Sequence, residues 1–165
     1  MNIKRILKHL VMTEWQVRRA FPRDTLIAIE NAIKATKSAH VGELRFAVEG
    51  ALHSMPLLNG QSPRERALEV FSHLRIWDTE HNNGVLIYLL LADRAVEIVA
   101  DRGVHAKVGT HGWEPICRTM EIAFGQGNYR EGAVSGIQAV AHHLAKHFPV
   151  RGSARNELPD EPVVL

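Results

Sequence analysis

Stretches with helical spacing of apolar residues alternate along the chain with stretches of strand-like spacing. The clearest helix start is Ser62-Pro63-Arg64-Glu65, because it is a capping box with proline at the first helical position. The first stretch also contains lysine and arginine residues, which predicts a basic amphipathic helix. Helices are expected within residues 1–20, from Pro22 onward, and over residues 62–75, 113–124 and 128–148.

Three stretches have the patterns of β-strands. Leu44, Phe46 and Val48 alternate with charged or small residues, which is typical of a half-buried strand within residues 43–52. The continuous apolar run from Val85 to Leu91 is typical of a central strand that is covered on both faces. The run from Val96 to Ala100 follows after a short gap, so these two strands are expected to form an antiparallel hairpin.

Helices on either side of a few strands predict an α/β protein, a three-layer α/β/α sandwich with a small mixed sheet. The unit from residues 43–52 through the helix 62–75 to residues 85–91 predicts a right-handed parallel crossover. The expected organisation is an N-terminal basic amphipathic helix over residues 1–20, an α/β/α domain over residues 21–149 and a flexible tail over residues 150–165.

Composition narrows the class of protein. A chain of 165 residues can form one domain with a sizeable core, and its single cysteine excludes an internal disulfide framework. The net charge of +2 argues against a nucleic-acid partner. The run from Val85 to Ala92 is far shorter than the about twenty residues of a helical membrane span, and the N-terminus lacks a secretory pattern. No transmembrane segment and a cytoplasmic location are therefore expected.

The predicted N-terminal helix has two interpretations. Its apolar stripe packs on the domain, which is the commoner arrangement and the one we favour, or it docks on a membrane surface or on a protein partner.

Oxygen-bearing side chains are expected to gather at one end of the predicted sheet. Glu43 and Asp101 offer carboxylates, and Asn82 and Asn83 offer amide oxygens, which are the ligands that Ca²⁺ or Mg²⁺ prefers. Arg102 at the same end is suited to an anion. The alternative is structural, because Asn-Asn-Gly is ordinary turn chemistry and the carboxylates can form ion pairs.

The opposite end of the sheet is a competing site. Glu49, Asp93 and Arg94 are expected there, and ligands of open α/β sheets bind beyond the carboxyl ends of parallel strands. The sequence does not decide between the two ends.

Several of these motifs together resemble the core and closing helices of the TPM-domain family over roughly residues 20–149. They are Asn82-Asn83-Gly84-Val85-Leu86-Ile87-Tyr88, Asp93-Arg94-x-Val96-x-Ile98, Gly103-Val104 and Phe124-x-x-Gly127-x-Tyr129-x-x-Gly132-x-x-x-Gly136-Ile137. The resemblance implies the same α/β/α sandwich.

Members of this family are commonly secreted or membrane-tethered, and a thylakoid-lumen branch is described as an acid phosphatase with calcium at its site. The present sequence reads Val104-His105-Ala106-Lys107-Val108 where many members have an acidic residue, so it is more similar to the soluble bacterial branch. The resemblance implies metal binding more strongly than it implies phosphatase activity.

We therefore expect a TPM-type module that binds a divalent cation or a small polar ligand at one sheet end. One alternative is a metal-assisted acid phosphatase, in which Glu43 and Asp101 hold the cation and Arg102 or Arg94 steadies the phosphoryl group. The other is a protein-interaction partner of a membrane-associated system that docks through the N-terminal helix.

Overall fold

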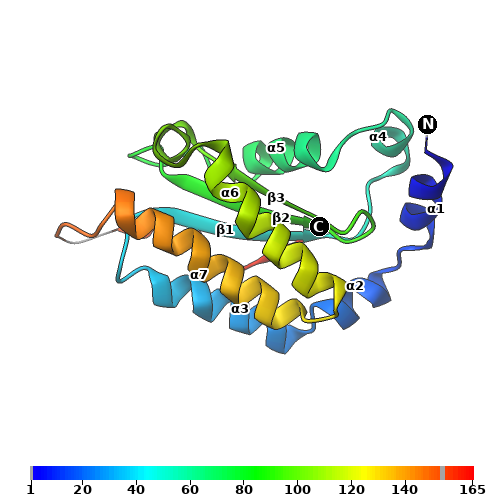
Figure 1. Cartoon of the computed structure of the whole chain (residues 1–165), viewed down its shortest axis with the longest axis horizontal. Coiled ribbons are helices and arrows are strands. Elements are labelled where there is room, and N and C mark those ends of the chain that lie inside the picture. Colours follow the sequence, from blue (N-terminus) through cyan, green and yellow to red (C-terminus); the bar gives the residue numbers. More distant parts are fainter. Residues whose placement is uncertain (1, 153–154) are drawn as a thin grey trace.

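A four-stranded mixed sheet runs through the centre of the computed structural model, which describes residues 2–152 and 155–165 (Figure 1). Its strand order is β3-β2-β1-β4, with β1 and β2 parallel, β1 and β4 parallel, and β2 and β3 antiparallel. The expected parallel pairing of the first two strands and the expected antiparallel hairpin are therefore confirmed. The strands are β1 (Glu43–Glu49), β2 (Gly84–Leu90), β3 (Ala95–Ala100) and β4 (Val163–Val164).

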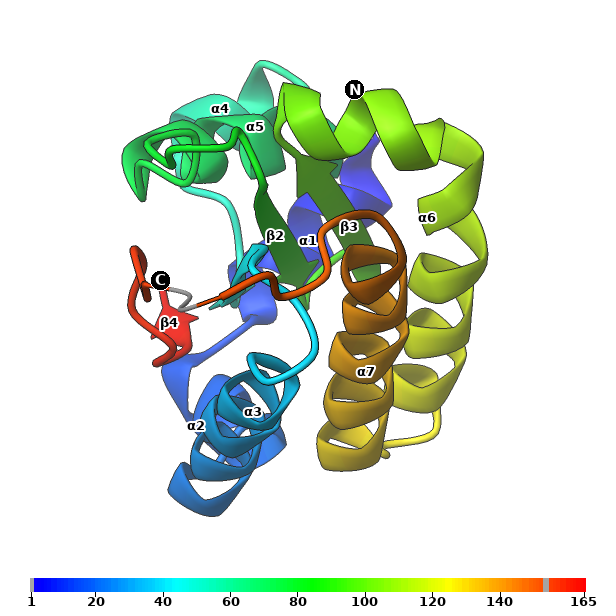
Figure 2. The same cartoon turned by 90° about the vertical axis from the view of Figure 1, so that its left-hand side faces the viewer.

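Helices cover both faces of this sheet, which confirms the three-layer α/β/α class (Figures 1 and 2). One face packs against α3, α6 and α7, and the other packs against α4 and α5. The helices of the described residues are α1 (Ile3–Val11), α2 (Glu14–Ala20), α3 (Arg23–Thr36), α4 (Ser54–Leu58), α5 (Pro63–His73), α6 (Arg102–Gly125) and α7 (Tyr129–His147).

Local capping sets where helices begin. The Ser62 hydroxyl accepts a hydrogen bond from the Glu65 amide, and the Glu65 carboxylate accepts one from the Ser62 amide, as the capping box predicts. A second capping box at Thr13 and Gln16 starts α2. Residues 1–20 therefore form two helices, which corrects the expectation of a single one.

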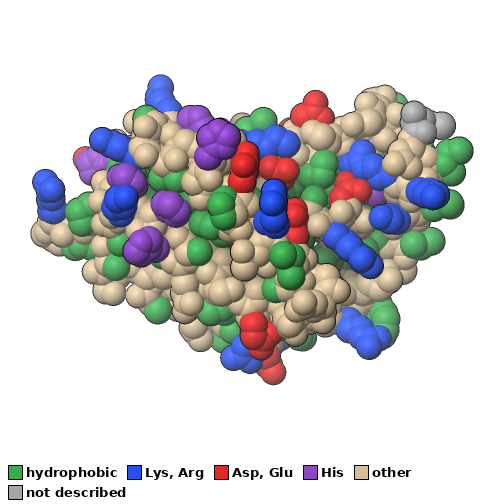
Figure 3. Space-filling model, viewed as in Figure 1, with side chains coloured by type: hydrophobic (Ala, Val, Ile, Leu, Met, Phe, Trp, Pro, Cys, Tyr) green, Lys and Arg blue, Asp and Glu red, His purple; other side chains and the backbone are tan. Residues whose placement is uncertain are grey.

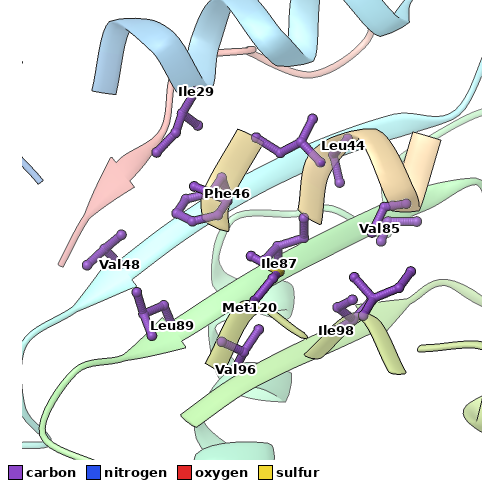
Figure 4. Close-up of a cluster of buried hydrophobic side chains, with 14 of the residues drawn as sticks. Ile29, Leu44, Phe46, Val48, Val85, Ile87, Leu89, Val96, Ile98 and Met120 are labelled. Carbon is purple, nitrogen blue, oxygen red and sulfur yellow. The ribbon is translucent and has the colours of Figure 1, made fainter. Parts of the chain in front are cut away.

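The larger core lies between the sheet and the layer of α3, α6 and α7 (Figure 4). Phe46, Ile87 and Met120 are all buried within it. A Cβ at Gly136 would lie 2.3 Å from the Met120 sulfur, so α6 and α7 can approach this closely only because residue 136 is glycine.

The strand β1 differs from the expected half-buried strand. All seven of its residues are buried, including Glu43, Arg45 and Glu49. The alternating pattern predicts a solvent-facing side because charged residues occupy it. In the structure that side is covered by the C-terminal segment and by α5, and each charge has a partner inside the protein.

Residues 157–165 are part of the fold, which corrects the expectation of a flexible tail for this part of residues 150–165; residues 153–154 lie outside the described residues. Val163–Val164 pairs with β1 as the edge strand β4. Upstream, the amides of Glu157 and Leu158 donate hydrogen bonds to the Glu43 carboxylate at 2.9 and 3.3 Å. The Arg45 guanidinium donates to the Pro159 carbonyl. The segment thus supplies partners for two buried charges of β1.

Removing residues 157–165 is expected to lower the free energy of unfolding by at least about 3 kcal/mol, because Glu43 and Arg45 would stay in the core without these partners. Urea unfolding followed by circular dichroism measures this change. The exposed Lys107→Ala variant, distant in sequence from β1 and the C-terminal segment, is the control and should stay within about 0.5 kcal/mol of the full chain. A truncated protein as stable as the full chain would show that the C-terminal segment does not stabilise the buried charges of β1.

Candidate functional site

The strand register places two groups of polar residues at opposite ends of the sheet. At the amino end of the parallel strands, Glu43 pairs with Gly84, and the neighbouring strand β3 ends one residue before Asp101. At the carboxyl end lie Glu49, at the end of β1, and the turn Asp93-Arg94 between β2 and β3. The separation that the topology predicts is therefore present.

Glu43 is fully engaged inside the protein. Its carboxylate accepts hydrogen bonds from the Glu157 and Leu158 amides and pairs with the Lys37 ammonium at 3.2 Å. A cation could bind Glu43 only after these contacts were broken, so its position indicates a structural role.

Asp101 caps the start of α6 and has one unused oxygen. Its Oδ1 accepts a hydrogen bond from the Arg102 amide at 2.7 Å, whereas its buried Oδ2 has no hydrogen-bond partner among the described residues. The Arg102 guanidinium donates to Asn82 Oδ1 at 3.2 Å. The Asn83 side-chain amide donates to the Val41 carbonyl at 2.9 Å, and its Oδ1 is likewise unpaired among the described residues.

The amino end therefore fits a divalent cation only in part. Ca²⁺ takes about six to eight oxygen ligands. Within residues 2–152 and 155–165, no three side chains of the types His, Cys, Asp and Glu are grouped to hold a metal ion. Asp101 fits a cation ligand through its unused oxygen, whereas Glu43 in its present contacts does not.

At the carboxyl end, both carboxylates are already paired. Glu49 accepts two hydrogen bonds from the Arg66 guanidinium, each at 2.9 Å, and a third from the Tyr88 hydroxyl. Burial and the Glu49 carboxylate raise the pKa of Tyr88, which keeps this hydroxyl protonated as a donor.

Asp93 accepts hydrogen bonds from Arg5 and His9 of α1. Burial alone would raise its pKa, but these hydrogen bonds outweigh burial and hold the pKa below its ordinary value. Asp93 therefore stays ionised and attached to α1.

A cleft of about 710 Å³ opens beside this turn, between α2, the β2–β3 hairpin and the turn from α6 to α7. Figure 1 shows these three segments meeting at the same end of the molecule. Leu89 and Leu91 lie among its lining residues. Its side chains of chemical interest are two guanidinium groups, two amides and three aromatic rings, from Arg19, Arg94, Gln16, Gln126, Trp15, Phe124 and Tyr129.

The two arginines of this cleft are unpaired. In the part of the chain that the structure describes, neither the Arg19 nor the Arg94 guanidinium makes an ion pair or a hydrogen bond, and Arg19 lies over the Trp15 ring at 5.2 Å. Sequence reasoning identified Arg94 but missed Arg19, Trp15 and Tyr129. These residues belong to the cleft because α2 and the turn at Gly127 pack beside the carboxyl ends of the parallel strands. That arrangement depends on tertiary packing, so no local sequence signal could have identified them.

A second, smaller cleft lies between β3 and α6 and includes Cys117. Burial raises the pKa of the Cys117 thiol to about 12, so it is a poor nucleophile at neutral pH. Glu121 accepts a hydrogen bond from the Val96 amide, and Arg64 donates one to the Ile98 carbonyl. These side chains form hydrogen bonds with backbone groups on the outer edge of β3, which disfavours pairing of this edge with a strand of another molecule.

The chain is similar to one protein family and to two solved structures. A family model described as the TPM domain matches residues 18–143. The NMR structure of the BA42 protein from the psychrophilic bacterium Bizionia argentinensis is similar, with a TM-score of 0.74 and 30% identity over 86% of this chain and 93% of that chain. The N-terminal domain of a protein from P. gingivalis has a TM-score of 0.56 and 25% identity over 73% of this chain and 76% of that chain. No curated protein sequence matches significantly.

His40, beside the amino end of the sheet, is expected to make stability depend on pH. Its ring is only 2% exposed, and neither ring nitrogen has a hydrogen-bond partner among the described residues. Burial lowers its pKa below the ordinary 6.5, and the nearby Lys37 acts in the same direction, whereas the Gly42 backbone close to the ring opposes part of this shift. Below that pH the unfolded chain binds a proton that the folded chain excludes, so the free energy of unfolding should fall as the pH drops from about 7 to about 5.

Urea unfolding across this pH range checks the prediction, with His40→Leu as the test variant. The fall in the free energy of unfolding should be smaller in His40→Leu than in the unsubstituted protein, because the buried titrating group is gone. Parallel pH profiles for the two proteins would contradict a role for His40.

Proposed function

The chain belongs to the TPM-domain family, and we propose that it is a binding module for a small anionic molecule with a flat apolar part. The ligand binds in the cleft lined by Arg19, Arg94 and Trp15. The observation that carries this proposal is the presence of two unpaired guanidinium groups beside aromatic rings at the carboxyl end of the parallel strands. This is the end where open α/β sheets bind ligands.

The charge of the cleft supports an anion. The carboxylate next to Arg94 in the chain, that of Asp93, is held by Arg5 and His9, so it does not neutralise Arg94. A guanidinium group matches the geometry of a carboxylate or phosphate and can donate two hydrogen bonds to it. Arg19 and Arg94 therefore supply positive charge that the protein itself leaves unmatched.

The walls of the cleft support an apolar part in the same ligand. The Phe124 and Tyr129 rings are stacked, with centroids 5.6 Å apart, and Trp15 lies across the cleft on α2. Ligand sites commonly combine such apolar walls with a few polar groups that fix orientation.

The backbone at Arg94 also supports a role for its side chain. Arg94 has a φ of +53°, in the left-handed region that glycine or asparagine occupies at lower cost. An arginine in this conformation costs about 1 kcal/mol, so the backbone itself does not favour arginine at this position.

A weak divalent-cation site at Asp101 is a second candidate function. The unpaired, buried Asp101 Oδ2 favours it. Acid phosphatase activity would in addition require Glu43 to release its internal hydrogen bonds, so we rank that activity behind both binding functions.

Phenyl phosphate is a suitable probe of the proposed cleft. In amide NMR titrations we expect shifts at cleft residues such as Gln126 and Tyr129. Arg94→Gln and Arg19→Gln should each weaken binding about ten- to hundredfold, the effect of losing one charge-assisted hydrogen bond of about 1.5 to 3 kcal/mol. Arg94→Gly should weaken binding equally while changing the free energy of unfolding by less than about 1 kcal/mol, because glycine suits the positive φ.

Arg102→Gln is the matched control for this titration, since it removes a guanidinium group from the opposite sheet end. It should leave the affinity unchanged. Loss of binding in Arg102→Gln with retention in Arg94→Gln would move the site to the amino end, and the absence of shifts at millimolar probe would reject the cleft.

Titration with Ca²⁺ and Mg²⁺ tests the second candidate. We expect shifts at Asp101 and its neighbours only at about millimolar metal, because few oxygens are unpaired there, and no shift at Glu43. Asp101→Asn should abolish the effect, whereas Asp78→Asn, which alters an exposed ion pair, should not. Unchanged spectra at millimolar metal would reject the cation site.

A further inference from the structure

The helix α1 is oriented with its apolar side toward solvent. Ile3, Leu7, Leu10 and Val11 are between 55% and 69% exposed, and their spacing places them on one side of the helix. We call these four side chains the α1 face. The expectation that the apolar stripe of this helix packs on the domain therefore holds for Ile6, which contacts the smaller core, and not for the α1 face.

Polar contacts on the other side of α1 fix this orientation. The Arg5 guanidinium donates hydrogen bonds to both oxygens of Asp93 and to the Gln61 carbonyl. The His9 ring is buried between two partners, with Nε2 3.0 Å from Asp93 and Nδ1 accepting the Leu52 amide at 3.0 Å. The α1 face is therefore held outward by specific contacts of the opposite side.

The charged side chains of α1 are all basic. Lys4 and Lys8 of the same helix are exposed, and α1 itself contains no acidic residue. Figure 3 shows hydrophobic side chains together with lysine and arginine at the end of the molecule that carries α1.

We propose that the α1 face binds the surface of an anionic lipid bilayer. The apolar side chains of the α1 face enter the region of the lipid headgroups, and Lys4 and Lys8 contact the anionic headgroups. The lysines favour a lipid surface over the apolar groove of a protein, because a groove would bury the apolar stripe and leave these charges without partners. This inference does not depend on the ligand cleft.

The geometry favours a helix that lies along the surface. The nine residues of α1 rise about 14 Å, roughly half the thickness of a hydrocarbon core. Among the described residues, no helix has both the length and the apolar character needed to cross a bilayer. Attachment is therefore reversible and depends on the charge of the lipid.

Co-sedimentation of the full chain with vesicles tests the proposal. One set of vesicles contains phosphatidylcholine alone, and the other also contains phosphatidylglycerol. We expect binding to the second set that weakens as salt is added, and a loss of about tenfold or more in affinity for the double variant Leu7→Gln, Leu10→Gln. Lys4→Gln with Lys8→Gln should weaken binding to the charged vesicles in the same direction.

The matched control is Leu68→Gln with Ile122→Gln, two exposed apolar residues on α5 and α6. These residues and the α1 face are exposed, so none of the substitutions should unfold the domain, and circular dichroism verifies this. Equal loss of binding in both double variants would overturn the proposal, as would equal binding to both vesicle types. A concentration-dependent dimer that the Leu7→Gln, Leu10→Gln variant disrupts, without vesicle binding, would assign the α1 face to a second copy of the chain and also overturn it.

Discussion

The structure depends on pairing the charged side chains that β1 carries into the interior. Glu43, Arg45 and Glu49 lie on a strand that is buried along its whole length. A buried charge without a partner costs several kcal/mol, so the fold must bring a partner to each one. The C-terminal segment supplies partners for Glu43 and Arg45, and Arg66 of α5 supplies one for Glu49. Covering β1 therefore determines where the chain end and α5 lie.

This pairing leaves the two ends of the sheet chemically different. At the amino end, the C-terminal segment uses the Glu43 carboxylate, and little anionic oxygen remains available to a cation. At the carboxyl end, Arg66 pairs with Glu49 and Arg5 pairs with Asp93, which also accepts a hydrogen bond from His9. Arg94 and Arg19 then remain without acidic partners among the described residues. The same requirement for paired carboxylates thus disfavours a cation at one end and favours an anion at the other.

Local signals in the sequence predicted the elements and their order well. The capping box at Ser62, the apolar run of β2 and the short gap before β3 depend on neighbouring residues, and the structure confirms each of them. One local signal was missed, the capping box at Thr13 that starts a second helix within residues 1–20. The other errors concern contacts between distant residues. The Glu43 carboxylate accepts a hydrogen bond from the Glu157 amide, which is 114 residues away in the sequence. No local sequence pattern predicts such a contact. The alternation of charged and apolar residues therefore predicted that one side of β1 faces solvent. In the structure the C-terminal segment and α5 cover that side.

The orientation of α1 shows why amphipathicity alone could not place that helix. The apolar stripe identifies a face that avoids water, but the surface that α1 contacts presents the Asp93 carboxylate, the Leu52 amide and the Gln61 carbonyl. An apolar stripe turned toward these groups would leave them buried without hydrogen bonds, which is costly. Arg5 and His9 satisfy them instead. Because Asp93 adjoins Arg94 in one turn, the contact that directs the α1 face outward also keeps the nearest carboxylate away from the cleft arginines.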